Sequence, residues 1–291
     1  MIRIKTYRAV EVYFDGKLND TTEEYLYSEI VNDDNGNLLS ENHYDTEGEM
    51  NYEYKAEYND KNQIVSELRI EDGEVIDNSK YTYEGDNLIE ERHLYEEGFE
   101  ERIVNEYDSN GLRIRQTSYD TDDEITEKLV YTYGGKNLVN IEYEDEDCKR
   151  SPNQQNEYDN AGNVIKVLYT NHEGNVLETD NTYDEKNRQT KTISYNEYKR
   201  IDSIEENEYN DKDLIVRTVR KERDRTITFD YEYNEIDRIS HFSITDNKGN
   251  VLQSADREYE NGLIARSVTT TIAPELQRKE IETVRYKYEE I

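Results

Sequence analysis

The sequence predicts an all-β protein made of tandem antiparallel β-hairpin repeats of about 25 residues each, forming one long, twisted or coiled β-meander sheet. Three observations predict this fold class. A tyrosine followed by a polar turn recurs with gaps of 24 to 26 residues. Apolar and polar residues alternate between the turns, as in half-buried strands, and Asp, Asn and Gly punctuate each half of the period. A fixed period of this length is the signature of a repeat architecture.

Each repeat is marked by one tyrosine, which we call its anchor tyrosine. A residue that tolerates a left-handed backbone follows most anchors, for example Asn62 or Gly111, and an aliphatic residue such as Ile64 or Leu112 comes next. This order is typical of a turn that leads into a strand. The anchors are Tyr58, Tyr83, Tyr107, Tyr133, Tyr158, Tyr183, Tyr209, Tyr233 and Tyr259.

A weaker turn signal recurs near the half-period, after Tyr44, Tyr95, Tyr119, Tyr143, Tyr169 and Tyr195. Each repeat therefore contains two strands and two turns, and the chain direction reverses at each turn. No linker composition interrupts the pattern, so we expect roughly 20 strands in a single continuous domain over residues 1–291. The pattern keeps its phase back to Tyr13-Phe14-Asp15-Gly16, near the start of the chain.

Alternation assigns side chains to faces. We expect Ile64, Leu68 and Ile70 on one face, and Val65, Glu67 and Arg69 on the other. The residue before each anchor should point away from the tyrosines. These residues, the pre-anchor row, are Glu57, Thr82, Glu106, Thr132, Glu157, Thr182, Glu208, Glu232 and Glu258. Aliphatic residues are few and 27 residues are Tyr, so tyrosine rings are expected to form most of the core.

The segment after Pro274-Glu275 has helix-start signals, and Ile281, Val284 and Tyr288 would share one face of a helix. Val284, Tyr286 and Tyr288 equally continue the strand alternation. We predict a strand.

Charge limits the partners. The chain has 36 basic and 69 acidic residues, a net charge of −33. Direct binding to nucleic acid or to an anionic membrane is therefore disfavoured. A cationic partner is favoured, namely another protein with a basic surface, with metal ions and polyamines as alternatives. The charge also keeps a long sheet soluble, a simpler reading that needs no partner.

Cys148 is the sole cysteine, so no intrachain disulfide forms, as in a reducing compartment. The first residues contain no apolar stretch of signal-peptide length, and no segment approaches the roughly 18 apolar residues of a spanning helix. We expect a cytoplasmic protein without membrane association, or a secreted one if a signal has been removed.

Segments such as Tyr107-Asp108-Ser109-Asn110-Gly111-Leu112 and Tyr158-Asp159-Asn160-Ala161-Gly162 resemble the tyrosine–aspartate repeats of the Rhs and teneurin families. The resemblance implies β-hairpins in a long spiralling sheet without catalytic residues. Asp follows the anchor only at Asp108, Asp159 and Asp184, and no Asp-Pro cleavage motif is present, so a free-standing array is expected rather than a toxin-enclosing shell. The chain is also loosely similar to the bacterial MORN-like antitoxins.

No catalytic, cofactor-binding or metal-ligating residue is predicted, and no cofactor. His43, His93, His172 and His241 lie too far apart in sequence for paired metal ligation and are expected at surface strands or turns. Cys148 falls in a charged turn. Two Asp/Asn/Gly runs, Asp33 to Asn37 and Asp159 to Asn163, resemble calcium loops but lack the bidentate Glu at loop position 12, so they are interpreted as β-turns.

Together these observations predict a non-enzymatic protein-binding or scaffold protein, such as an immunity or antitoxin-like protein or a secretion-associated partner. Repeat arrays offer extended surfaces for this. Two alternatives stay open. An acidic DNA mimic would need carboxylates spaced like phosphates along one face, and a carbohydrate-binding protein would need exposed tyrosines beside two carboxylates.

Overall fold

The computed structural model describes residues 1–95 and 98–291, and in these residues the chain consists of 22 strands and one 3-10 turn. Two compact units are present. The first contains Met1–Asn51, Arg188–Thr192 and Asp202–Ile291, and the second contains Tyr52–Asn187 and Ile193–Ile201. The expectation of a single domain stays a prediction.

The strands follow one another at short intervals along the chain. They are β1 (Ile2–Phe14), β2 (Lys17–Asn32), β3 (Leu38–Tyr44), β4 (Met50–Tyr58), β5 (Ile64–Glu71), β6 (Glu74–Glu84), β7 (Asn87–Tyr95), β8 (Glu100–Tyr107), β9 (Arg113–Tyr119), β10 (Ile125–Gly134), β11 (Asn137–Glu144), β12 (Arg150–Tyr158), β13 (Val164–Thr170), β14 (Val176–Tyr183), β15 (Gln189–Tyr195), β16 (Ile201–Tyr209), β17 (Ile215–Glu222), β18 (Arg225–Tyr233), β19 (Ile239–Asp246), β20 (Val251–Glu260), β21 (Leu263–Ala273) and β22 (Arg278–Glu290).

Antiparallel hairpins are confirmed. In the second unit each strand from β4 to β13 pairs with the next one in sequence, and in the first unit each strand from β16 to β21 does the same. The turn predicted after Tyr95 falls at Glu96, which lies outside the described residues. Within residues 1–95 and 98–291, no helix is both long and apolar enough to cross a membrane.

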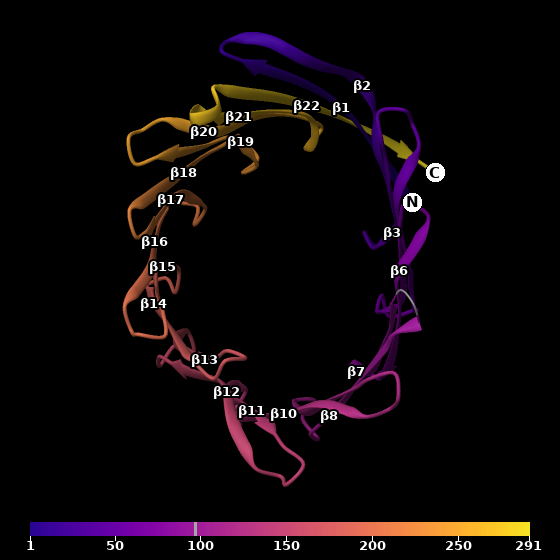
Figure 1. The fold of residues 1–291 in the computed structure, drawn as a ribbon, viewed down its shortest axis with the longest axis vertical. Coiled ribbons are helices and arrows are strands. Elements are labelled where there is room, and N and C mark those ends of the chain that lie inside the picture. The colour runs from indigo at the N-terminus through magenta and orange to yellow at the C-terminus, as the bar shows by residue number, and fades with distance from the viewer. Residues whose placement is uncertain (96–97) are drawn as a thin grey trace. The chain divides into compact units, whose positions relative to one another are not determined.

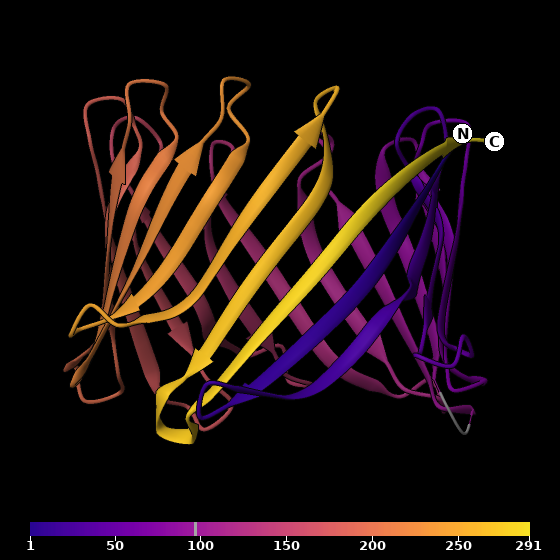
Figure 2. The ribbon, with the colours of Figure 1, turned by 90° about the horizontal axis from the view of Figure 1, so that it is seen from above.

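The meander prediction needs a correction at the chain ends. A simple meander leaves its first and last strands as free edges, but β1 pairs with β2 on one side and with β22 on the other, from Ile2↔Glu290 to Phe14↔Arg278. Figures 1 and 2 show β22 running beside β1. Both terminal strands therefore have hydrogen-bonded neighbours on two sides, which removes the unpaired donors and acceptors of a sheet edge.

One five-residue turn recurs between strands. At Asp108 the carboxylate oxygen Oδ1 accepts the backbone N–H of Asn110 at 2.8 Å and of Leu112 at 2.9 Å. The N–H of Asp108 in turn donates to the Leu112 carbonyl at 2.9 Å. The fourth residue, Gly111, has φ +77°, a conformation that glycine adopts without strain. Asp159, Asp246, Asn171 and Asn210 begin turns of the same kind.

A β-bulge recurs opposite the anchor tyrosines. In the β10–β11 pair Tyr133 faces Leu138 while Thr132 faces Asn140, so one extra residue, Val139, lies between them. The same register shift occurs at Tyr58, Tyr83, Tyr107, Tyr158, Tyr209, Tyr233 and Tyr259. This register shift makes one sequence prediction wrong. Because Val65 is an extra residue, Ile64 lies on the same face as Tyr58, whereas Leu68 lies on the opposite face.

The bulges explain the hydroxyl groups of the tyrosines. A bulge interrupts the ladder of backbone hydrogen bonds. The phenol of the next anchor along the chain donates to the backbone carbonyl of the residue that faces the preceding anchor at the bulge. Tyr158 Oη donates to Leu138 O at 2.7 Å, and Leu138 is the residue opposite Tyr133. The other donor–acceptor pairs are Tyr107–Leu88, Tyr133–Arg113, Tyr183–Val164, Tyr209–Gln189, Tyr233–Ile215, Tyr259–Ile239 and Tyr288–Ile264, at 2.7 to 3.0 Å.

The predicted tyrosine core is only partly found. Among the described residues, the buried apolar side chains are Tyr54, Ala56, Val130, Tyr131 and Ala255. The anchor rings are half-buried. Strands contact chiefly their sequence neighbours, and β1 contacts β22, so each unit has one layer of sheet and its side chains are covered mainly by neighbours on the same face.

Two further predictions are confirmed. Every member of the pre-anchor row is exposed. The segment after Pro274 forms a short 3-10 turn, η2 (Pro274–Leu276), and then the strand β22 instead of a helix. We call the side of the sheet that carries the anchors the Tyr face and the side that carries the pre-anchor row the charged face.

Candidate functional site

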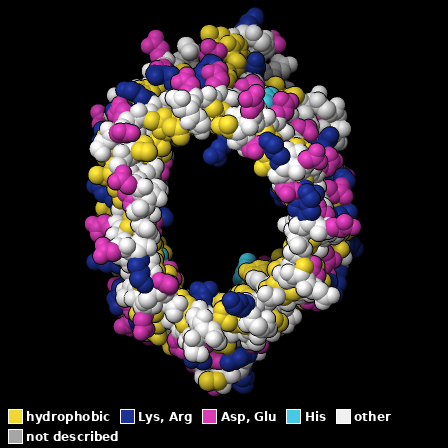
Figure 3. Space-filling view, turned by 180° about the vertical axis from the view of Figure 1, so that it is seen from behind, with side chains coloured by type: hydrophobic (Ala, Val, Ile, Leu, Met, Phe, Trp, Pro, Cys, Tyr) yellow, Lys and Arg dark blue, Asp and Glu magenta, His cyan; other side chains and the backbone are white. Residues whose placement is uncertain are grey.

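Four members of the pre-anchor row face a basic residue on the neighbouring strand. Glu106 faces Arg115 across the β8–β9 pair, and Glu157 faces Lys166 across β12–β13. In the first unit Glu208 faces Arg217 and Glu258 faces Arg266, whose Nη1 lies 3.2 Å from the Glu258 carboxylate. Figure 3 shows acidic and basic side chains interspersed over the visible surface. The charged face therefore carries both signs of charge.

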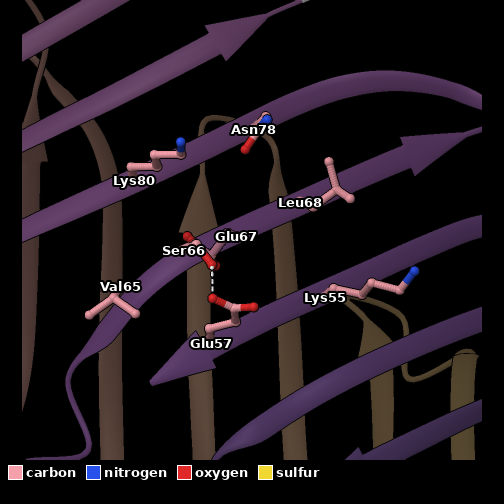
Figure 4. A pocket seen from close by; sticks show the side chains of 8 residues that line it. All are labelled: Lys55, Glu57, Val65, Ser66, Glu67, Leu68, Asn78 and Lys80. Carbon is pink, nitrogen blue, oxygen red and sulfur yellow. Dashed lines mark hydrogen bonds between the residues drawn. The ribbon is translucent and has the colours of Figure 1, made fainter. Parts of the chain in front are cut away.

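One hollow on this face spans β4, β5 and β6 and has a volume of about 450 Å³. Two cross-strand rows line it: Glu57–Ser66–Lys80, and Lys55–Leu68–Asn78. Figure 4 shows the Ser66 and Glu57 side chains facing one another, and Ser66 Oγ donates to Glu57 at 3.2 Å. Carboxylate, hydroxyl, amide and ammonium groups thus surround Leu68, a set suited to polar contacts with a partner surface.

Glu67 also borders this hollow, but its carboxylate is held by two phenols on the Tyr face. Tyr54 Oη donates to one carboxylate oxygen and Tyr81 Oη donates to the other, at 2.5 Å. Burial, and next the hydrogen bond to Glu67, raise the pKa of both phenols well above the usual value. Both tyrosines therefore stay protonated donors at neutral pH and fix the strand that carries the hollow.

A second polar cluster adjoins it on β6 and β7. Ser79 is fully buried, and its hydroxyl donates to Asp77 Oδ1 at 2.7 Å. Because a hydroxyl has one hydrogen, the 2.7 Å contact between Ser79 Oγ and His93 Nδ1 requires Nδ1 to carry the donated proton. His93 Nε2 lies 3.8 Å from Glu91.

This Ser–His–carboxylate set lacks the geometry of an activated nucleophile. The hydroxyl hydrogen of Ser79 points to Asp77, so His93 is not placed to remove it. The serine oxygen is also inaccessible to a substrate because the residue has 0% exposure. The cluster instead satisfies buried polar groups on a single-layer sheet.

The other residues singled out from the sequence lie apart. His43 stacks on Tyr27, with ring centroids 5.3 Å apart, and His241 Nδ1 lies 2.7 Å from Asp256. His172 is exposed in a turn, as predicted, and so is Cys148. His93 departs from the surface prediction, because its side chain is only 17% exposed. In the described part of the chain, no three His, Cys, Asp or Glu side chains gather as a metal site would require.

Sequence reasoning missed the Tyr54–Glu67–Tyr81 bridge and the buried Ser79. The alternation correctly assigned Glu67 and Arg69 to the face away from Leu68. It gave no sign that Glu67 would meet two phenols, because Tyr54 and Tyr81 come from different repeats and their distance depends on the strand register. No pattern within a single repeat signals this contact.

The chain matches no protein-family model and no curated protein, so the resemblance to tyrosine–aspartate repeats stays a prediction. A crystal structure of TcdB2-TccC3-Cdc42 is 10% identical, with 91% of this chain and 19% of that chain covered and a TM-score of 0.36. This chain thus spans about a fifth of that chain's length. A porin-like protein from Bacteroides uniformis is 9% identical over 99% of this chain and 97% of that one, with a TM-score of 0.28. A loop deletion mutant of OmpT, an outer membrane protein of Vibrio cholerae, is 10% identical over 99% of both chains, with a TM-score of 0.19.

These matches correct two predictions. The expectations of a cytoplasmic location and of no membrane association are wrong as stated, because two porin-like proteins and an outer membrane protein match over 91% or more of this chain. The sequence criterion used for membrane association explains why this prediction failed. A search for roughly 18 consecutive apolar residues tests only for helices, and a single cysteine does not fix a compartment. At these TM-scores the likenesses assign no activity to this chain.

Proposed function

We propose that this chain is a non-enzymatic scaffold or binding protein and that its charged face contacts another protein. The observation that supports this most is the pre-anchor row, whose nine members are all exposed. Their side chains repeat once per hairpin, whereas eight phenols on the opposite face are used in hydrogen bonds to backbone carbonyls. One face is thus left for recognition, as in other repeat arrays with extended binding surfaces.

The charge pattern supports a DNA mimic less well. Neighbouring strands lie about 4.8 Å apart, so pre-anchor residues two strands apart are separated by roughly 10 Å, against about 3.4 Å of rise per phosphate along one DNA strand. Thr82 and Thr132 interrupt the acidic row, and basic residues such as Arg115 and Lys166 face its members. A mixed pattern of this kind favours a protein surface of complementary pattern.

Carbohydrate binding is supported by one feature only. A hollow of about 350 Å³ between β10, β11 and β12 brings Tyr143 near Glu127 and Glu144. The Glu144 side chain is only 9% exposed and lies 3.4 Å from Arg150 and 3.6 Å from Arg115. Since Glu144 already takes part in two ion pairs, this hollow favours a sugar less than the charged face favours a protein.

The test removes charge from the exposed row in one unit. The triple variant Glu208→Gln, Glu232→Gln, Glu258→Gln is compared with the parent chain in affinity capture from the source cells, and the captured protein is then purified for surface plasmon resonance. We expect the variant to bind about tenfold or more weakly, mainly through slower association, and the parent's association rate to fall as salt rises.

The matched control is Asp211→Asn, Asp224→Asn, Glu235→Gln, which removes three exposed acids from turns of the same unit. The control should bind like the parent. Equal binding by all three proteins, or equal loss in both variants, would refute a contact through the charged face, and so would a parent chain that retains no protein at micromolar concentration.

A further inference from the structure

A second and larger hollow lies on the Tyr face of the first unit, over β18 to β21 and η2, with a volume of about 770 Å³. Its lining includes the apolar residues Ile227, Phe229, Ile244, Leu252 and Ile272. The strand register explains how they meet. Phe229 on β18 faces Ile244 on β19, so apolar groups from these two strands form one continuous surface. The amide of Gln253 on β20 lies next to Ile244.

The positions four and six residues before the anchor Tyr233 are both apolar, whereas the repeat of Tyr83 has Ser79 and Asp77 at these positions. Phe229 and Ile227 occupy the same face of β18 as the anchor Tyr233, four and six positions before it. Their side chains are half-buried and therefore still reach solvent at the hollow. The volume is within the range of about 300 to 1,000 Å³ that is typical of small-molecule sites.

The rim of the hollow has two basic groups, Arg225 and Lys248. In the described residues, no carboxylate oxygen lies within 4.0 Å of either side-chain nitrogen group. Two acidic residues also line the rim. Asp246 is engaged by its own turn, because its oxygens accept the N–H groups of Lys248 and Asn250 and the Asn250 amide at 2.8 to 2.9 Å.

Among the described residues, Glu275 in the exposed η2 turn is the one rim carboxylate that accepts no hydrogen bond within its own turn. In the part of the chain that the structure describes, neither Arg225 nor Lys248 is in an ion pair, although Lys248 lies close enough to Asp246 to contribute to the lowered pKa of that carboxyl, after the hydrogen bonds of the turn. Both basic groups therefore offer N–H donors to an anion at the mouth of an apolar hollow. An arginine fork recognises a carboxylate well because it offers two parallel N–H donors.

We propose that this hollow binds a small amphipathic carboxylate, a ligand with one carboxylate and an unbranched apolar body such as a medium-chain fatty acid. The carboxylate lies at Arg225 and Lys248, and the apolar body covers Phe229, Ile244 and Leu252. This site is independent of the proposed protein contact, which uses the opposite face of the sheet.

The probe is dodecanoate, titrated below its micelle concentration into the full chain by isothermal calorimetry at low salt. We expect one site per chain. The double variant Arg225→Gln, Lys248→Gln should weaken dodecanoate binding about tenfold or more and leave binding of the uncharged analogue dodecanol unchanged. Glu275→Gln should strengthen dodecanoate binding about two- to threefold because it removes a repulsive charge.

The matched control is Lys17→Gln, Arg238→Gln, which removes two exposed basic groups outside the hollow. It should bind dodecanoate like the parent. An equal loss in both double variants would show that only overall charge matters and would overturn the proposal.

A chain-length series tests the apolar part of the site. From octanoate through decanoate to dodecanoate, affinity should rise about three- to fourfold per added methylene if the body is buried. An affinity that does not change with length, or no binding by the parent chain anywhere in the series, would also overturn the proposal.

Discussion

A tyrosine combines a large apolar ring with one hydroxyl, and this chain uses the two parts for different tasks. The anchor ring covers the sheet surface of its own hairpin, and the hydroxyl donates to a carbonyl at the bulge of the preceding repeat, as Tyr133 does to Arg113 at 3.0 Å. Phenylalanine could supply the ring but not the donor. The periodic tyrosines, which the sequence showed clearly, therefore act as repeat-to-repeat bonds as well as packing material.

The first prediction isolates that hydroxyl. Tyr133→Phe keeps the ring and removes the donor to Arg113 O, so the free energy of unfolding should fall by about 1 kcal/mol. Urea denaturation measures this change. The control is Tyr198→Phe, because Tyr198 is 73% exposed in a turn, and it should be neutral. Equal effects of the two substitutions would refute a specific role for the anchor hydroxyl.

The second prediction concerns alkaline pH. The pKa values of Tyr54 and Tyr81 are raised by burial and by Glu67. A raised pKa in the folded state means that the stabilisation is complete below the unfolded value of about 10 and is lost as pH rises through the folded value. Melting temperature should therefore fall above about pH 10, and less steeply in Tyr54→Phe, Tyr81→Phe.

The ionisation itself can be followed by ultraviolet absorbance. The parent should contain tyrosines that ionise later than the rest, and the double variant should lose that late fraction. A titration curve with the same shape in both proteins would contradict the Tyr54–Glu67–Tyr81 bridge.

At the scale of elements, the sequence predicted the hairpins and their turns because both depend on local chemistry. Asp108 and Gly111 specify a turn within five residues, by side-chain hydrogen bonding and by positive φ. The bulges were not predicted. An extra residue such as Val139 leaves the 25-residue period unchanged and is visible only in the pairing of two strands. For the same reason Ile64 was assigned to the wrong face.

The third prediction tests the turn carboxylate. Asp159 accepts hydrogen bonds from the Asn163 side chain and from the backbone of Ala161 and Asn163, and these lower its pKa. A lowered pKa in the folded state means that the stabilisation is present above the unfolded value of about 3.9 and is lost as pH falls through the folded value.

Asparagine occupies the equivalent position at Asn171 and Asn210. Asp159→Asn should therefore nearly retain the melting temperature at pH 7 and reduce its fall in acid, whereas Asp159→Ala should lower it at both pH values. Calorimetric scans at pH 7 and pH 3 distinguish the two variants. A neutral Asp159→Ala would show that this turn does not depend on its side chain.

At the scale of the whole molecule, sequence periodicity predicted how many strands follow one another but not where the terminal strands lie. Nothing in a repeated motif indicates that β1 and β22 pair, since each could equally end as an edge. The small number of fully buried apolar side chains follows from the same architecture. With one layer of sheet in each unit, tyrosine rings become half-buried and the large charge is distributed over turns and the exposed face.

The fourth prediction follows from the pairing of the terminal strands. Amides in residues 2–14 and 278–290 should exchange with deuterium as slowly as those of β18 to β20, because β1 has hydrogen-bonded neighbours on both sides and β22 pairs with β1 and β21. Hydrogen exchange with mass spectrometry measures this directly. Exchange within the dead time at both ends would contradict the pairing.

The most direct test of the account compares its two faces in one experiment. Tyr209→Phe, Tyr233→Phe, Tyr259→Phe removes three anchor hydroxyls, and Glu208→Gln, Glu232→Gln, Glu258→Gln changes the three residues just before them. For each triple variant, the unfolding free energy and the affinity for the captured protein are measured together. The account predicts that the Phe variant loses about 3 kcal/mol of stability and keeps its affinity while folded, and that the Gln variant keeps its stability and loses affinity. The reverse result, or equal effects of both variants on both quantities, would contradict it.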